Sequence, residues 1–181
     1  MNYQEYQQLF DKVLESRNPP YNDEMYFNYT KLNRSRMKRW DKQLQIKEEL
    51  LDSIKAIEKP QHWIIITEPW CGDAAHIIPF LISLAEQSPL ITYDLQLRDA
   101  EPYLINSYLT NGTKSIPKLI VRDENGTDIF NWGPRPAKAQ ELFDQLKANK
   151  ADFEEMKIAL QHWYNEDKGQ SLMNELKEFY S

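Results

Sequence analysis

Between residues 61 and 149 the sequence alternates between strand-like and helix-like patterns in an order that few folds accommodate. Residues 62–67 are rich in β-branched side chains and lie between Pro60 and Pro69, which predicts a buried parallel strand. A helical pattern follows, and then a second strand at residues 90–97 and a short helix at residues 101–108. This strand–helix–strand unit predicts two parallel strands joined by a crossover helix.

A hairpin and a further helix complete the series. Residues 118–121 and 128–132 are strand patterns, and the Asn125-Gly126 pair between them suits the positive φ angles of a tight turn. Residues 137–149 are helical in pattern. We therefore expect an α/β fold with a mixed central sheet of about four strands, flanked by helices.

Helical patterns also extend the chain at both ends of this core. Apolar residues recur at helical spacing from Tyr3 to Leu14 and from Met37 to Ile54. A similar stripe runs from Phe153 to Tyr180, interrupted at residues 167–169. We expect an N-terminal helical extension over residues 1–60, a core over 61–149, and a C-terminal helical extension over 150–181, all in one compact unit. The last stripe is expected to pack on the core and the N-terminal helices, with a dimer interface as the alternative.

Charge and hydropathy narrow the classes of partner. The formal net charge of −6 argues against nucleic-acid binding, because phosphate binding needs a concentrated positive field. The apolar runs are far shorter than the ~20 residues that span a bilayer, so no membrane partner is expected. The first residues lack the basic and apolar regions of a signal peptide, which indicates a cytoplasmic protein. Monomer and homodimer remain open.

The one basic cluster of the sequence lies within residues 31–42. A solvated helix face explains it, and a docking patch for an acidic partner or a phosphate is the alternative. Its members are Lys31, Arg34, Arg36, Lys38, Arg39 and Lys42.

A single cysteine, Cys71, stands where the strand at residues 62–67 gives way to a helix, so the chain has no internal disulfide. Unpaired N–H groups and the positive end of the helix dipole stabilise a thiolate at such a place and lower the thiol pKa from ~8.5. The position therefore suits a nucleophile, since the thiolate is the attacking species in disulfide exchange. A buried cysteine that packs as a small apolar residue is the alternative.

The neighbours of Cys71 carry further expectations. Asp73 is predicted to cap the helix, and its charge would oppose formation of a thiolate. His76 is expected to pair with Asp73 across one helical turn. Trp70 either covers the site or packs in the core. One cysteine and three scattered histidines lack the spacing of metal ligands, so no metal site is expected.

Two local motifs, together with the order of elements, resemble the thioredoxin fold. The segment Trp70-Cys71-Gly72-Asp73-Ala74 is similar to the Trp-Cys-Gly-Pro-Cys active site of thioredoxins. Pro79 lies in the next helix, where thioredoxins carry a kinking proline. Ser115-Ile116-Pro117-Lys118 resembles the element of a hydrophobic residue and a cis-proline that faces that active site. The chain looks most like larger bacterial thioredoxin-like proteins with an N-terminal helical extension and a Trp-Gly-Pro-Arg-Pro segment, here residues 132–136.

The resemblance implies roles for particular residues. Cys71 would be the catalytic nucleophile, and a cis Ile116–Pro117 bond would help to orient a substrate. Arg135 is expected to be structural, because the loop after the hairpin lies away from the thiol in this fold. The substrate-binding residues implied are Trp70, Gly72, Asp73, Ile116 and Pro117.

Ala74 departs from the family pattern, because it stands where thioredoxins carry the resolving cysteine. The isolated chain therefore cannot turn over as a dithiol reductase or oxidase. Cys71 would form mixed disulfides with a protein disulfide or a small thiol, resolved by an external thiol such as glutathione or bacillithiol, as in monothiol glutaredoxins. Such a monothiol oxidoreductase would act in cell redox homeostasis without a cofactor. Oxidation of Cys71 to a signalling sulfenic acid and a redox-inactive binding protein are the alternatives.

Overall fold

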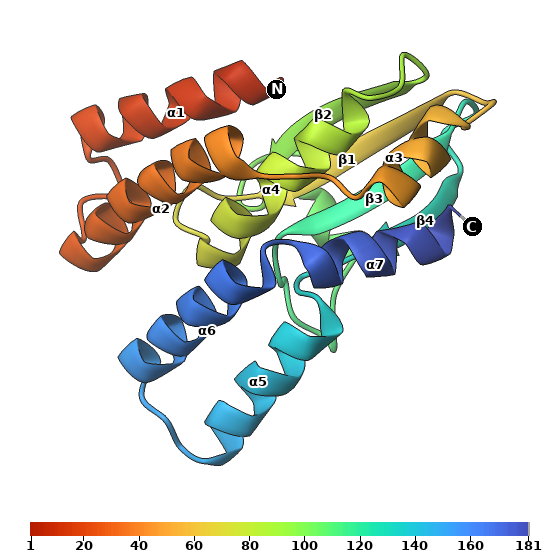
Figure 1. The fold of residues 1–181 in the computed structure, drawn as a ribbon. Helices are drawn as coiled ribbons and strands as arrows, with labels where there is room; N and C mark the ends of the chain where they lie inside the picture. The colour runs from red at the N-terminus through yellow and green to blue at the C-terminus, as the bar shows by residue number, and fades with distance from the viewer. Residues whose placement is uncertain (181) are drawn as a thin grey trace.

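A computed structural model describes residues 1–180, and its centre is one four-stranded sheet in the order β2–β1–β3–β4 (Figure 1). The first two strands pair in parallel, and the other pairs are antiparallel. The sheet therefore confirms the predicted mixed α/β fold. The strands are β1 (Gln61–Thr67), β2 (Ile91–Leu97), β3 (Lys118–Asp123) and β4 (Asp128–Trp132).

Strand β1 lies at the centre of the core because its side chains are apolar on both faces. Every residue from Trp63 to Thr67 is buried. Helix α4 (Gly72–Ala85) packs on β1 and β2 and is itself covered by another helix, so nearly all of its side chains are buried. This environment explains the apolar composition of α4. In the chain order, the N-terminus of α4 follows the end of β1.

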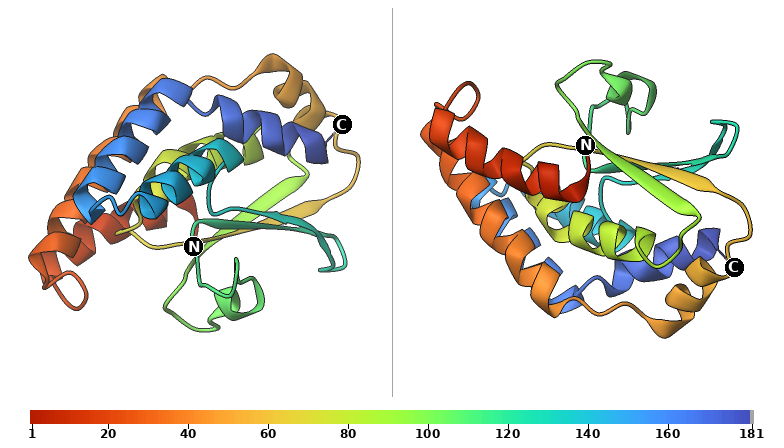
Figure 2. Two further views of the ribbon diagram at one scale, coloured as in Figure 1. Left: turned by 90° about the horizontal axis from the view of Figure 1, so that it is seen from below. Right: turned by 90° about the horizontal axis from the view of Figure 1, so that it is seen from above.

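Two further helices were predicted in the core, and only one of them is a regular α-helix. The helix predicted over residues 101–108 is shorter in the structure, a 3₁₀ helix η1 (Leu104–Ser107). Tyr103 adopts a left-handed conformation with φ of 54°, which an α-helix does not contain. Figure 2 shows the η1 segment on the opposite side of the sheet from α4. Helix α5 (Ala137–Ala148) follows β4, as predicted.

Three helices precede the sheet: α1 (Tyr3–Ser16), α2 (Glu24–Gln43) and α3 (Glu48–Lys55). Helix α2 packs against both α1 and α4. The single helix predicted from Met37 to Ile54 was wrong, because Leu44 is extended (φ −62°, ψ 145°) and separates α2 from α3. The backbone N–H of Lys47 in this gap contacts Met173 Sδ at 3.3 Å, a tertiary contact that periodicity does not reveal.

Two helices follow α5: α6 (Phe153–Asp167) and α7 (Gln170–Phe179). The predicted interruption at residues 167–169 is confirmed, and Gly169 has a φ of 76°. A Cβ at Gly169 would lie 2.4 Å from a ring carbon of Phe80, so both backbone and space require glycine there. Helix α6 packs against α5 and α7 against α3 (Figures 1 and 2). No helix within residues 1–180 has the length and apolar character needed to cross a membrane.

Candidate active site

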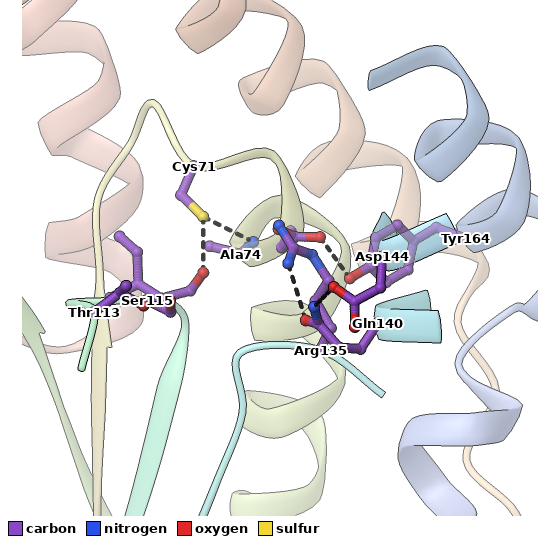
Figure 3. Close-up of polar contacts among 10 residues, drawn as sticks. Cys71, Ala74, Thr113, Ser115, Arg135, Gln140, Asp144 and Tyr164 are labelled. Carbon is purple, nitrogen blue, oxygen red and sulfur yellow. Dashed lines mark hydrogen bonds and ion pairs between the residues drawn. The ribbon is translucent and has the colours of Figure 1, made fainter. Parts of the chain in front are cut away.

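Cys71 is the N-cap residue of α4, and its sulfur lies between two elements that are far apart in sequence. The backbone N–H of Ala74 donates to Sγ at 3.5 Å, and the thiol donates to the carbonyl of Ile116 at 3.4 Å (Figure 3). The Ile116–Pro117 peptide bond is cis, as the resemblance implied. The start of α4 and the loop before β3 therefore meet at the thiol.

Burial dominates the electrostatics of this thiol. The residue is 7% exposed, and this burial, with a smaller contribution from the Asp73 carboxylate, raises the Cys71 pKa to about 12. The Ala74 N–H and the Arg135 charge act in the opposite direction but are weaker. The sequence left open whether the helix terminus or the opposing influences would determine this pKa. Burial outweighs the helix terminus, and position in the sequence gives no measure of desolvation.

Asp73 lies in the first turn of α4 and does not cap it, contrary to the prediction. The chain is still extended at Cys71, with φ of −80° and ψ of 116°, so Cys71 takes the capping position. The Asp73 carboxylate instead accepts from the Tyr164 hydroxyl at 2.7 Å and pairs with the Arg135 guanidinium at 2.8 Å. One carboxylate thus joins α4, the loop after β4 and α6.

Arg135 lies at the site rather than away from it, which also corrects the prediction. Gly133, two residues earlier, has a φ of 117°, and a Cβ there would lie 2.3 Å from the Pro117 carbonyl oxygen. This close approach seats the loop after β4 directly on the cis-proline loop. The guanidinium then reaches Asp73 and lies 4.2 Å from the centre of the Phe143 ring. It also donates to Gln140, one of the contacts drawn in Figure 3.

His76 does not pair with Asp73 as expected. Its Nδ1 accepts from the Trp40 indole N–H at 2.9 Å, and its Nε2 lies 3.2 Å from Gln161 Oε1. The tautomer with the proton on Nε2 fits both contacts. Burial lowers the pKa of His76 to about 3, so the imidazole is neutral and joins α4 to α2 and α6.

These residues surround a cavity of about 450 Å³. Among the residues predicted for the site, Trp70, Cys71, Gly72, Asp73 and Ile116 line it, and Pro117 does not. Trp70 forms part of the rim, where its ring packs edge-on against Tyr26 at 5.8 Å. Among residues 1–180, no group of three or more histidine, cysteine or acidic side chains is placed to hold a metal ion.

The other wall of the cavity comes from α2 and α6, and sequence reasoning missed it. The sequence showed Arg36 only as one member of the basic cluster. Nothing in the pattern indicated that its side chain would be buried. The residues that these two helices add include Tyr29, Arg36, Lys157, Gln161 and Tyr164.

Comparisons with known proteins agree with this geometry. A family model described as thioredoxin matches residues 20–147. The fold is similar to the crystal structure of a protein of unknown function from Pseudomonas aeruginosa, with a TM-score of 0.53 and 17% identity over 77% of this chain and 86% of that chain. It is also similar to an HIV epitope-scaffold, with a TM-score of 0.52 and 15% identity over 96% and 98% of the two chains. No curated protein matches the chain.

Proposed function

The chain belongs to the thioredoxin family, and from this membership we propose that it carries out thiol–disulfide exchange through the single thiol of Cys71. The placement of the thiol carries the proposal. Its sulfur lies at the N-terminus of α4, against the Ile116 carbonyl, on the wall of a cavity of about 450 Å³. Because Cys71 is the only cysteine, the mixed disulfide must be resolved by a thiol of another molecule.

Two exchanges make up the proposed cycle. In the first, the Cys71 sulfur attacks a small disulfide and bonds to one of its sulfurs. The other half leaves as a thiol and takes up the proton that Cys71 loses. In the second, another small thiol attacks the bound half at its sulfur, departs with it as a disulfide, and passes its proton to Cys71. Each exchange breaks one S–S bond and forms one, so no further oxidant or reductant takes part.

The high thiol pKa determines the rates of these steps. At pH 7 a thiol with a pKa of about 12 is almost entirely protonated, so the first exchange is slow. The same high pKa makes Cys71 a poor leaving group once the mixed disulfide has formed. We therefore expect a slowly formed, long-lived mixed disulfide rather than rapid turnover.

Access to the thiol favours a small partner over a protein. Cys71 is 7% exposed and opens onto the cavity, which is large enough for a molecule of a few hundred Å³. A disulfide anchored in a folded protein would have to reach a sulfur that is largely covered by its surroundings. A small thiol or disulfide can instead enter the cavity itself. A monothiol oxidoreductase of this kind fits the cytoplasm, where small thiols are abundant.

Intact-mass spectrometry of the folded protein with glutathione disulfide tests the proposal. We expect one glutathionyl group to be added slowly to the wild-type protein, and removed again by a small thiol. The Cys71→Ser variant should remain unmodified, with its fold checked by circular dichroism.

Urea-unfolded wild-type protein is the matched control, because unfolding exposes the same thiol and returns it to an ordinary pKa. It should be modified much faster than the folded protein. If the unfolded chain is modified while the folded chain takes up no adduct, Cys71 serves only as an apolar packing residue and the proposed function is wrong.

A further inference from the structure

Arg36 is a buried cation on α2 that faces the cavity without an acidic partner. It is 7% exposed, and its only hydrogen bond within the described residues runs from Nη1 to Asn33 Oδ1 at 2.9 Å. Its buried Nε has no hydrogen-bond partner, and none of the ion pairs among residues 1–180 includes it. Buried charges in proteins are ordinarily paired, so this guanidinium is suited to an anion from outside the chain.

The contacts that hold Arg36 leave it rigid. Asn33, which accepts its hydrogen bond, donates its own amide to the Pro69 carbonyl at 3.0 Å. The Arg36 guanidinium carbon also lies 5.2 Å from the centre of the Tyr29 ring. Its charge is one of the causes that lower the pKa of His76, which places it close to the imidazole. A fixed, desolvated guanidinium of this kind binds a carboxylate with little loss of side-chain freedom.

Cations outnumber acids among the residues that line the cavity, although the chain as a whole is acidic with a net charge of −6. Two of these cations are paired with acids outside the lining, Arg98 with Asp99 at 2.7 Å and Lys157 with Glu154 at 2.6 Å. Asp73 is the one carboxylate in the lining, and it is already paired with Arg135. Lys157 faces Tyr29 from α6, with its ammonium 4.4 Å from the ring centre. The cationic residues in the lining are Arg36, Arg98, Lys114, Arg135 and Lys157.

Aromatic side chains supply much of the uncharged part of the lining. They would hold the apolar part of a ligand, and the volume of about 450 Å³ lies within the usual range for small-molecule sites. These side chains are Tyr26, Tyr29, Trp70, Phe143, Phe153 and Tyr164.

We propose that the cavity binds a small organic carboxylate whose acid group is held by Arg36. That the carboxylate is part of a small thiol or disulfide rests on the function proposed above. The site then selects the partner of Cys71: an acidic small thiol or disulfide is preferred to a neutral or basic one of the same size.

Three symmetric disulfides of similar size test this selection by mass spectrometry: dithiodipropionate (anionic), hydroxyethyl disulfide (neutral) and cystamine (cationic). The rate at which each modifies Cys71 is compared in the wild-type protein, Arg36→Gln and Lys38→Gln. Lys38 is an exposed cation of the same helix outside the cavity, so its removal makes the same change in net charge. We expect Arg36→Gln to slow the anionic disulfide by about tenfold or more, as for loss of a hydrogen bond to a charged group, and to leave the neutral one unchanged. Lys38→Gln should change neither rate, and Arg36→Lys should recover part of the preference.

The outcomes separate this inference from the function on which it rests. If Arg36→Gln slows modification by all three disulfides equally, Arg36 affects the reactivity of the Cys71 thiol. The proposal that Arg36 binds a carboxylate is then wrong. The site is also wrong if the wild-type protein shows no preference for the anionic over the neutral disulfide once each rate is divided by that of the urea-unfolded protein. If no disulfide modifies folded protein, the exchange function fails, and calorimetry with the thioether thiodipropionate decides the site by itself. Binding by the wild-type protein that is lost in Arg36→Gln supports it, and no binding by the wild-type protein overturns it.

Discussion

The cavity has a core wall, from the start of α4 and the loop after β4, and an added wall, from α2 and α6, and the two differ in how their charges are satisfied. The wall from the thioredoxin core carries Cys71, Asp73 and Arg135, and its acid and base are paired with each other at 2.8 Å. The wall from the added helices carries Arg36, which has no acidic partner among residues 1–180. Under the two proposals above, the core wall would control the reactivity of the thiol, and the added wall would determine which molecule reaches it.

The largest expected effect comes from removing the carboxylate beside the thiol. Asp73 raises the pKa of Cys71, and Arg135 lowers it, so Asp73→Asn removes the first influence and frees the second. A neighbouring charge commonly shifts a pKa by about 1–3 units, so we expect the alkylation rate at pH 8 to rise at least about tenfold. The measurement is the rate of iodoacetamide modification as a function of pH.

Asp11→Asn is the control for this change. Asp11 lies on α1, is exposed, and pairs with Arg34 at 3.4 Å, away from the cavity. Its substitution should leave the alkylation rate unchanged. An unchanged rate in folded Asp73→Asn would mean that burial alone holds the thiol protonated, and the core wall would then lose the role assigned to it.

The next effect concerns two buried groups whose contributions to stability have opposite pH dependence. Burial raises the pKa of Glu68, which lies next to the core wall, to about 7. Between about pH 4.5 and 7 the folded state therefore binds more protons than the unfolded state, and the free energy of unfolding falls as pH rises. Burial lowers the pKa of His76, which lies at the contact between the two walls, to about 3. Between about pH 3 and 6.5 the unfolded state therefore binds more protons than the folded state, and the free energy of unfolding rises with pH. The two contributions oppose each other from about pH 4.5 to 6.5.

Single substitutions should separate these contributions. Relative to the wild-type protein, Glu68→Gln should become more stable as pH rises from 5 to 6.5, and His76→Gln less stable, each by at most about 1.4 kcal/mol per pH unit. Urea unfolding at several pH values gives the slopes, which are independent of any constant loss of packing. Parallel curves for a variant and the wild-type protein would show that the substituted group does not titrate differently in the folded state.

The sequence predicted the core wall better than the added wall, for physical reasons. Strand and helix patterns and the motif around Cys71 are local, so they identify the sheet, α4 and the loop at Ile116. The position of Arg135 depends on the contact between Gly133 and the Pro117 carbonyl, which joins distant segments. Periodicity predicted a helix only from Met37 onward, whereas α2 begins at Glu24, and the pattern does not show that Arg36 is buried. The direction in which the thiol pKa shifts could not be predicted for the same reason, since desolvation is a property of the packed structure.

The smallest expected effect tests the contact that joins the two walls. The resemblance gave Gly72 a role in substrate binding, but in the structure a Cβ at Gly72 would lie 2.7 Å from the hydroxyl oxygen and 3.0 Å from a ring carbon of Tyr29 on α2. Gly72→Ala must therefore push Tyr29 aside, at a cost of about 1–3 kcal/mol, offset by the roughly 0.5–1 kcal/mol that alanine adds to a helix. We expect a net loss of about 1 kcal/mol in urea unfolding.

A double-mutant cycle with Tyr29→Ala identifies the source of that loss. In the Tyr29→Ala background the three atoms nearest to the added methyl group are gone, so Gly72→Ala should become neutral or slightly stabilising. An equal cost in both backgrounds would place the strain in the backbone at the start of α4 instead. Tyr29 would then not be what requires glycine beside the thiol, and the core and added walls would be independent at this position.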